Sequence, residues 1–523
     1  MEAKPHKNPM LPTPTRIAPT LPPTLPPTLP TIVPTTLLFL CTFLTTLLLG
    51  YTLYQDGDTH WHLAAGREIL QTLSLPHTDN WTFASDQQWY NISWLFDIVI
   101  AAIAIPLGDF GLHIATLLCG ALLICEILRT LKQWESTTFE ARFLAASLSA
   151  IALLNYTVLR PQLAACFLAL YGLTALQKSR KNPQALLLLP ILTIAWVNIH
   201  GSFPVLALLL AAHGAEALYQ SEWKRFQTLF LVGTTCAIAT LINPLGFEVY
   251  TGMERTLHSA LSPFITEWHG WRAHTTTYHG VSTLIFITGI FGVSTLLRHS
   301  TIPLAERIMT FGFTLLSFLS IRHFSFLAVI APPFVALALT GTKKTWPFKF
   351  PFNKLPLAPL VLIGILAIGY TAFLHSDALS KKISSKFTAD YMDRESIHII
   401  HQNLPGKKVI NEYDLGGALA NFGEGKIPYY MDGRAGTAFS EKILTEYIDT
   451  LILNKTPLVV ILEKYQPEVA MFQNMSMTHR IAGSQLKELG WRIFHQNKKN
   501  IIYISPPKKH ELDNEKSQHK IKP

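Results

Sequence analysis

Carboxylate and imidazole side chains gather in one short segment, DGDTHWHLAAGREIL at 56–70. Asp56 and Asp58 could accept a proton from a hydroxyl group, which is the work of a general base. His60 and His62 could bind a substrate, and Asp58 with His62 could also hold a divalent cation. The spacing D-x-H-x-H matches no strong metal signature, so no cofactor is firmly predicted. The segment directly follows an apolar run, where ionisable groups are costly and indicate a functional site.

Further polar residues stand at the ends of apolar runs later in the chain. Those with the chemistry to bind a substrate are Arg160, Gln162, Asn198, His200, Arg322 and His323. An arginine can bind a phosphate through two hydrogen bonds, which suits a phosphate-activated substrate. The alternative is that these groups only cap helix ends. Near the C-terminus, Asp432 and Arg434 could pair around Gly433 and fix a turn, or could contact an acceptor.

The composition is that of a membrane protein with a soluble part attached. Of the 523 residues, 49% are hydrophobic and 15% are charged, whereas a soluble protein carries about 25% charged residues. The net charge is +9, but most basic residues lie in short loops between apolar runs, which indicates membrane topology and argues against a nucleic-acid partner. The five cysteines all lie in apolar runs, so we expect no disulfide framework.

The apolar runs predict the elements that position these residues. A first span is expected at 36–54, and further runs lie near 93–107, 111–131, 143–158, 162–177, 185–198, 203–219, 226–243, 281–297, 306–321, 324–341 and 356–375. Basic loops should face the cytoplasm, and they all do so only if 93–107 lies along the membrane interface. The result is about eleven spans, with the N-terminus inside and the C-terminus outside. The spans hold few ionisable groups, Asp97 and Glu126 being the exceptions.

The chain divides into four parts. Residues 1–35 are rich in Pro and Thr and predict a disordered cytoplasmic tail, and 36–375 form the multi-span domain, with a first outer loop at 55–110. Residues 376–507 predict a small extracytoplasmic α/β domain, with strands at 459–462 and 501–504 and helices at 440–453 and 478–489. Residues 508–523 predict a charged, disordered tail. Most tryptophans of the outer loops, such as Trp81 and Trp89, fit an interfacial belt, and a minority could stack on sugar rings.

The order of the motifs resembles a known family. The first outer loop reads D-x-D-x-x-W-H-L-x-x-G-x-x-I-L, then P-x-x-D ending at Asp79, then W-x-x-x-x-W-L; later come R-P-Q (160–162), W-x-N-x-H-G (196–201), N-P-x-G (243–246), N-x-Y-D-x-G-G (411–417) and M-D-G-R (431–434). This arrangement resembles bacterial multi-span proteins related to the C-type glycosyltransferase fold, whose better-known relatives are protein mannosyltransferases and the aminoarabinose transferase of lipid A. One departure is His60, which stands where the family usually has the first Trp of a W-W-H triplet.

The resemblance implies an α-helical polytopic membrane protein that transfers a sugar from a polyprenyl-phosphate-linked donor on the outer face. In that fold an acidic residue of the first outer loop is the catalytic base, which would be Asp58 or Asp56 here, with Asp79 among the substrate-binding residues. The expected partners are the lipid-linked donor and a glycan, lipid or protein acceptor, in the bacterial inner membrane. Two alternatives stay open: a transporter of a lipid-linked glycan, and a non-catalytic assembly protein that binds through 376–507.

Overall fold

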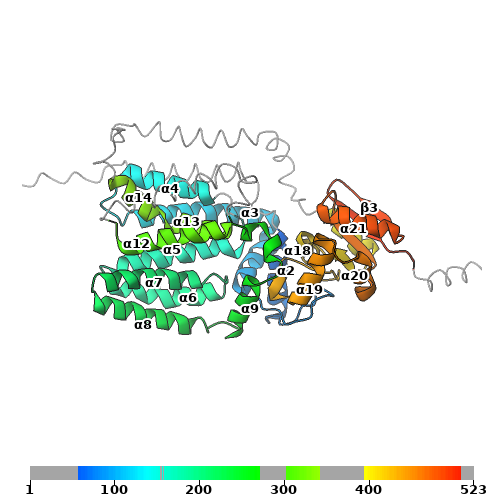
Figure 1. The fold of residues 1–523 in the computed structure, drawn as a ribbon, viewed down its shortest axis with the longest axis horizontal. Helices are drawn as coiled ribbons and strands as arrows, with labels where there is room; N and C mark the ends of the chain where they lie inside the picture. The colour runs from blue at the N-terminus through cyan, green and yellow to red at the C-terminus, as the bar shows by residue number, and fades with distance from the viewer. Residues whose placement is uncertain (1–56, 154–155, 157, 271–301, 342–393, 508–523) are drawn as a thin grey trace, which may run out of the picture.

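A helical bundle and a smaller α/β domain meet end to end in the computed structural model of the chain (Figure 1). The structure describes residues 57–153, 156, 158–270, 302–341 and 394–507. Asp56, the two predicted tails and the predicted spans at 36–54, 281–297 and 356–375 lie outside the described residues. Helix α2 (Gly57–Thr72) lies at the junction of the two parts.

The bundle helices follow the apolar runs of the sequence. They are α3 (Trp94–Leu131), α4 (Phe139–Leu153), α5 (Pro161–Ser179), α6 (Leu188–Val197), α7 (Pro204–Tyr219), α8 (Trp223–Ala239), α12 (Leu304–Leu319), α13 (Phe324–Ile330) and α14 (Pro332–Gly341). Shorter elements join them: η3 (Pro183–Leu187), α9 (Glu248–Leu257), η4 (Ser262–Phe264), η5 (Thr266–Trp268) and η6 (Ile321–His323). Proline begins α5, α7 and α14, where the missing N–H of its backbone costs nothing.

Helix α3 is broken where the sequence predicts two separate segments. Gly108 has φ 58° and ψ −153°, outside the helical region, and so divides the helix after residue 107. Glycine adopts this backbone conformation without the steric penalty of other residues. The interfacial position of the first segment stays a prediction.

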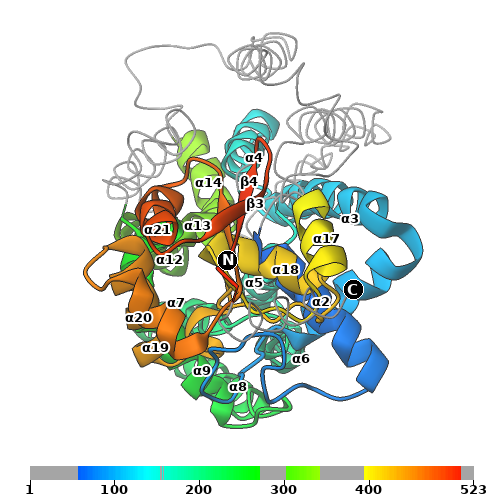
Figure 2. The same ribbon diagram turned by 90° about the vertical axis from the view of Figure 1, so that its right-hand side faces the viewer.

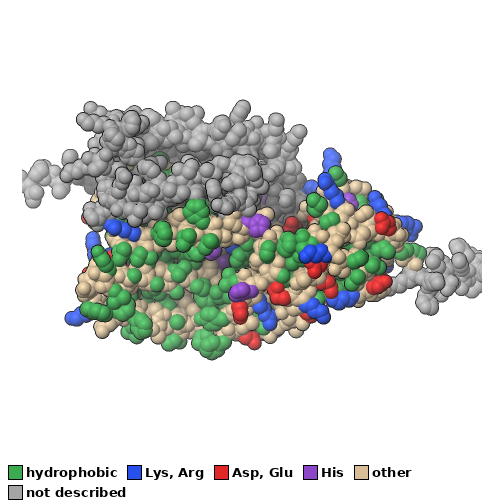
Figure 3. Space-filling model, in the orientation of Figure 1, with side chains coloured by type: hydrophobic (Ala, Val, Ile, Leu, Met, Phe, Trp, Pro, Cys, Tyr) green, Lys and Arg blue, Asp and Glu red, His purple; other side chains and the backbone are tan. Residues whose placement is uncertain are grey.

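One described helix, α3, is long and apolar enough to cross a membrane, or two spans exist if the bent pair Ile321–Ile330 and Pro332–Ala338 counts as one. Large apolar side chains remain exposed on the bundle, among them Ile105, Phe110, Phe230, Leu231 and Phe311, and Figure 3 shows such side chains along its visible face. Exposed apolar surface of this extent is typical of contact with lipid. The count of about eleven spans stays a prediction.

Buried charges tie three helices together at the end of the bundle far from the outer domain. The Nη2 atom of Arg180 lies 2.6 Å from Glu216 of α7 and 2.7 Å from Glu306 of α12. Both carboxylates are nearly inaccessible. Asp97 and Glu126 are therefore not the only ionisable groups within the predicted spans, although Glu216 and Glu306 stand in the terminal turns of their helices.

The outer domain is built around a mixed four-stranded sheet with the order β1-β2-β4-β3. Strand β1 (Val409–Asn411) runs parallel to β2 (Val469–Gln473), while β4 (Asn500–Ile504) is antiparallel to both β2 and β3 (Arg492–Gln496). The helical elements are α17 (Arg394–Asn403), η8 (Tyr413–Leu415), α18 (Gly416–Phe422), η9 (Ala435–Thr437), α19 (Glu441–Tyr447), the π-helical η10 (Ile448–Ile452), α20 (Leu458–Tyr465) and α21 (Met477–Glu488).

The predicted strand at 501–504 is confirmed, whereas the one predicted at 459–462 is wrong. Residues 458–465 form helix α20. Leu458 and Ile461, three residues apart, are both buried, which puts them on one face of a helix. A short apolar run fits a strand and a buried helix equally well, and here packing decides.

The first outer loop belongs to the hydrophobic core of the outer domain. Trp61 of α2, together with Trp81 and Trp89 of the loop, packs in the same cluster as β1, β2 and β4. Helix α18 approaches α2 so closely that a Cβ on Gly417 would lie 2.2 Å from the carbonyl oxygen of Gly57. Figure 2 shows α18 and α2 next to each other in the view onto the outer domain. The two parts of the molecule therefore hold each other in a fixed arrangement.

Candidate active site

A cavity of about 1270 Å³ lies where the bundle meets the outer domain. Its walls come from the first turn of α2, the chain before α5, the turn between α6 and α7, η5, η6 and turns of the outer domain. Elements far apart in the sequence thus present their ends to one space. The predicted site residues that line it are Asp58, His62, Arg160, Gln162, His200, Arg322, His323 and Arg434.

Asp58 is held in the cavity wall by two donors. Its Oδ2 lies 3.2 Å from Nη2 of Arg160, and its Oδ1 accepts a 3.2 Å hydrogen bond from Nε1 of Trp61. The residue stands in the first turn of α2, where the helix dipole favours a negative charge. Its side chain is 29% exposed, so a molecule in the cavity can reach the carboxylate.

Gly433 closes over Asp58 from the outer domain. A Cβ on Gly433 would lie 2.0 Å from Oδ1 of Asp58. We expect Gly433→Ala to displace the carboxylate and lower any activity that depends on Asp58 by about a hundredfold, because a misplacement of about 1 Å is enough for such a loss. Gly312→Ala is the control, since nothing lies within 4 Å of that position. Equal product formation by Gly433→Ala and the wild type in a membrane assay would contradict this prediction.

A chain of alternating charges crosses the cavity. Arg160 bonds through Nη1 to Oε2 of Glu267 at 2.9 Å, and Nη1 of Arg322 lies 3.5 Å from Oε1 of the same carboxylate. The guanidinium carbon of Arg322 lies 4.8 Å from the ring centre of Trp268, within the range of a cation–π contact. Among the described residues, Arg160 has the carboxylates of Asp58 and Glu267 as ion-pair partners, whereas the ion pair of Arg322 is with Glu267 and is longer.

His62 is oriented by a buried carboxylate. Its Nδ1 lies 2.6 Å from Oδ1 of Asp97, which is inaccessible to solvent. The other oxygen of Asp97 accepts a 2.8 Å hydrogen bond from Nδ2 of Asn91. The ring of Trp61 stacks on the imidazole at 3.5 Å between ring centres. Because Asp58 and His62 are four residues apart on α2, they lie on the same face of the helix.

His200 is held in the turn that follows α6. Its Nδ1 accepts a 3.1 Å hydrogen bond from the backbone N–H of Ser202 and lies 2.6 Å from Oγ of the same residue. Burial, and next the positive charge of Arg322, lowers the pKa of His200 to about 3. The ring is therefore neutral at physiological pH.

Two of the predicted substrate-binding residues lie away from the cavity lining and are engaged elsewhere. His60 is buried against Phe422, and its Nδ1 lies 3.1 Å from Nδ2 of Asn421 on α18. Asn198 ends α6, accepts a 2.8 Å hydrogen bond from Nε1 of Trp94 and donates to two backbone carbonyls. Asn198 thus has the helix-end role that the sequence left open, whereas His60 joins α2 to α18.

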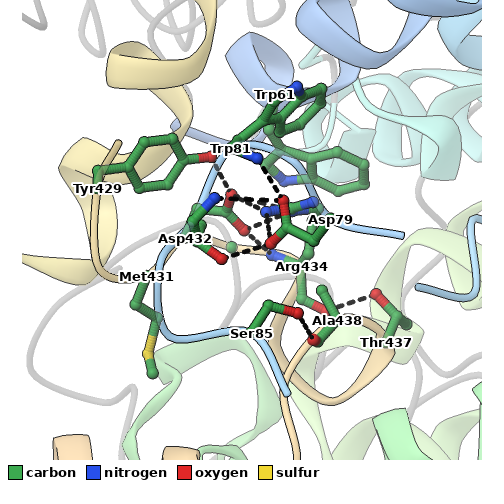
Figure 4. Close-up of polar contacts among 12 residues, drawn as sticks. Trp61, Asp79, Trp81, Ser85, Tyr429, Met431, Asp432, Arg434, Thr437 and Ala438 are labelled. Atoms are coloured by element: carbon green, nitrogen blue, oxygen red, sulfur yellow. Dashed lines mark hydrogen bonds and ion pairs between the residues drawn. The ribbon is translucent and has the colours of Figure 1, made fainter. Parts of the chain in front are cut away.

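Asp79 and Asp432 are also outside the lining. Both pair with Arg434, which borders the cavity but whose side chain is buried (Figure 4). The Nη2 atom of Arg434 lies 2.8 Å from Asp79 and 2.9 Å from Asp432, and all three side chains are inaccessible. The guanidinium carbon lies 4.6 Å from the ring centres of both Trp81 and Trp89. These two tryptophans are therefore packed around a buried cation, and their assignment to an interfacial belt is wrong.

Neither a family model nor a curated protein sequence matches this chain, but solved structures do. The oligosaccharyltransferase of Archaeoglobus fulgidus in its apo form matches with a TM-score of 0.56 at 11% identity, covering 85% of this chain and 70% of that chain. ArnT of Cupriavidus metallidurans, bound to undecaprenyl phosphate, matches with a TM-score of 0.51 at 12% identity, over 91% of this chain and 99% of that chain. The mycobacterial arabinofuranosyltransferase AftD gives 0.51 at 15% identity, over 91% of this chain and 40% of that one. The chain has the C-type glycosyltransferase fold.

The proteins that share the C-type glycosyltransferase fold are integral membrane proteins, with which a membrane location of this chain is consistent. The Archaeoglobus enzyme AglB has also been solved with a dolichol-phosphate and an inhibitory peptide. At these identities the likeness establishes the fold and not the activity of this chain.

Three residues at or next to this cavity were not among the predicted candidates. Asp97 had a signal, because a lone carboxylate in an apolar segment requires a partner. Glu267 lies between the apolar runs at 226–243 and 281–297, where nothing in the sequence sets it apart. Tyr413 lines the cavity and donates a 3.3 Å hydrogen bond from Oη to the carbonyl oxygen of Gly433. Burial, and next the charge of Asp58, raises the pKa of Tyr413, so the phenol stays protonated.

In the described ranges no three carboxylate, imidazole or thiol groups come together as metal ligands. Asp58 and His62 line the same cavity, but each already has a polar partner: Arg160 for the carboxylate and Asp97 for the imidazole. Asp56, which could add a further carboxylate, lies outside the described residues. The donor set seen here suits hydrogen bonding to a substrate more directly than it suits a divalent cation.

Proposed function

We propose that this protein is a membrane glycosyltransferase that moves a sugar from a polyprenyl-phosphate-linked donor to an extracytoplasmic acceptor. The observation that carries the proposal is the cavity itself, where a reachable carboxylate, Asp58, lies near Arg322 at the end of an apolar helical bundle. A lipid-linked substrate requires both features, since its chain needs an apolar surface and its phosphate needs a cation.

Asp58 is the proposed general base. The acceptor hydroxyl gives its proton to the carboxylate while its oxygen forms a bond to the anomeric carbon of the sugar. The bond between that carbon and the phosphate oxygen breaks, and polyprenyl phosphate leaves with the electron pair. Because the leaving group is already a stable anion, the protein needs a base for the acceptor and a cation for the phosphate.

Arg322 is the proposed phosphate ligand. Arg160 is already neutralised by carboxylates at 3.2 Å and 2.9 Å, whereas in the part of the chain that the structure describes Arg322 has one ion pair, at 3.5 Å. We expect Arg322→Met to weaken the binding of decaprenyl phosphate by about tenfold or more, because a hydrogen bond to a charged group contributes about 1.5–3 kcal/mol. Titration of the purified protein with this lipid measures the effect. Arg129→Met is the control, and equal affinity of Arg322→Met and wild type would contradict the assignment.

The membrane arrangement belongs to the same proposal. The bundle crosses the bacterial inner membrane with about eleven spans and the N-terminus inside, and the outer domain and the cavity lie outside. Basic loops support this orientation, because Lys178, Arg180, Lys224 and Arg225 flank the ends of α5 and α8 that lie opposite the cavity. Figure 3 shows Lys and Arg side chains at that end of the bundle.

The test is a comparison of glycolipids and glycoproteins, by mass spectrometry, in cells with and without the gene. A sugar increment that disappears on deletion and returns with the wild-type gene supports a transferase, and its carrier identifies the acceptor as a glycan, lipid or protein. An unchanged increment, with the donor lipid accumulating on one side of the membrane, would instead favour a transporter. Loss of an assembled surface structure without any change in sugar composition would favour an assembly protein.

A further inference from the structure

Two histidines of the cavity are held in opposite tautomers, so that Nε2 is a hydrogen-bond acceptor in one neutral ring and a donor in the other. We propose that His62 and His200 together bind one hydroxyl group of the transferred sugar, with His62 as the hydrogen-bond acceptor and His200 as the donor. This inference rests on the proposed function for the identity of the ligand. The hydrogen bonds at Nδ1 of each ring determine which Nε2 atom donates and which accepts.

A chain of hydrogen bonds that begins at the backbone fixes the polarity of His62. The N–H of Ser93 donates to Oδ1 of Asn91 at 3.1 Å, which sets the orientation of that amide. Nδ2 of Asn91 therefore donates to one oxygen of Asp97 at 2.8 Å, and the other oxygen lies 2.6 Å from Nδ1 of His62. An ionised carboxylate can only accept, so Nδ1 carries a proton, and in the neutral form of the ring Nε2 is left as an acceptor.

The reverse holds for His200. A backbone N–H can only donate, and that of Ser202 lies 3.1 Å from Nδ1 of His200. Oγ of Ser202 accepts from Nε1 of Trp196 at 3.1 Å, so its own proton is available for Nδ1 as well. Nδ1 is thus an acceptor, and the neutral ring carries its proton on Nε2, which is a donor.

A hydroxyl group matches this pair because it donates one hydrogen bond and accepts others. A carboxylate has no proton to give to His62, and an ammonium group has no lone pair to accept from His200. Both rings line the same cavity, and the positive charge of Arg322 lowers the pKa of His200. His200 therefore lies near the proposed phosphate ligand, where the sugar bonded to that phosphate would be.

The tautomers can be read directly from long-range ¹H–¹⁵N NMR spectra of the full chain with ¹⁵N-labelled histidine in detergent micelles. We expect the Nδ1–H pattern for His62 and the Nε2–H pattern for His200. His62→Gln and His200→Gln each remove one set of signals and so assign it, while His60→Gln should leave both unchanged. An Nε2–H pattern for His62, or an Nδ1–H pattern for His200, in the wild-type spectrum overturns the proposal without need of any further variant.

Asp97→Asn tests the pair from outside the cavity. Two NH₂ groups cannot face each other, so the new amide must turn its oxygen to Asn91 and its NH₂ to His62. Nδ1 of His62 then accepts, the ring proton moves to Nε2, and the acceptor becomes a donor. We expect transfer to fall by at least about tenfold, because a site built to bond a hydroxyl loses strongly when one partner has the wrong polarity. Binding of decaprenyl phosphate, which has no sugar, should stay within about twofold of the wild type.

The outcomes separate this inference from the proposed function. Asp449→Asn, a matched change at an exposed ion pair of the outer domain, should leave both tautomers and transfer unchanged. If the wild-type chain transfers sugar and Asp97→Asn transfers it equally well, the pairing of His62 and His200 is overturned and the proposed function stands. A wild-type chain that transfers no sugar would overturn the proposed function, and with it the sugar as ligand. Weaker lipid-phosphate binding in Asp97→Asn would show a general distortion of the site and would overturn the positioning role of Asp97.

Discussion

Asp58→Asn should abolish sugar transfer while leaving the protein inserted and folded. The substitution keeps the shape of the side chain but removes its negative charge, and a neutral amide cannot take the proton of the acceptor hydroxyl. A well-placed general base contributes about 10²- to 10⁴-fold to the rate, so the sugar increment should fall at least about a hundredfold. Mass spectrometry of membranes from the deletion strain, complemented with either gene, measures the loss.

The fold should tolerate this change because the network around Asp58 is redundant. Arg160 keeps its 2.9 Å bond to Glu267 when the 3.2 Å ion pair to Asp58 is lost. The amide oxygen can still accept from Nε1 of Trp61, the present 3.2 Å partner of Oδ1. A partly exposed ion pair contributes little to stability. Asp449→Asn serves as the matched control, and a full sugar increment from Asp58→Asn would rule out this residue as the base.

The helices of the bundle could be predicted from sequence because each signal is local. An apolar run sets the length of a helix, a proline marks its first turn, and a glycine such as Gly108 marks a break. The error at 459–462 has the same origin, because a run of four apolar residues does not reveal whether its neighbours in space require a strand or a helix. In α20 the spacing of Leu458 and Ile461 became informative only once the hydrophobic core that both residues join was known.

The candidate site was predictable where its residues stand at helix ends. Asp58, Arg160, His200 and Arg322 all lie next to the limits of apolar runs, and those limits meet at one face of the bundle. What could not be predicted are the partners within that face. The role of Asp79 depends on a residue in another domain, and no periodicity of the first outer loop shows that its tryptophans enclose an arginine.

That arginine gives the second prediction of large effect. Arg434→Ala should destabilise the contact between the first outer loop and the outer domain by about 3–5 kcal/mol, the usual result of removing one partner from a buried ion pair. The side chains of Asp79 and Asp432 are inaccessible, so both would be left as buried charges without their cation. The space between Trp81 and Trp89 would also be empty.

The effect should be local to the junction, and the measurement can show this. Loss of Arg434 should lower the melting temperature in detergent and expose the outer domain to limited proteolysis near the junction. Arg434→Lys should recover little, because an ammonium group cannot reproduce the planar contacts with two rings and two carboxylates. Lys426→Ala is the control, since its ion pair with Glu424 is about two-thirds exposed on both sides. If Arg434→Ala had the same melting temperature as the wild type, the ion pairs of Arg434 with Asp79 and Asp432 would not be what joins the two parts. Other contacts would then have to hold Gly433 over Asp58.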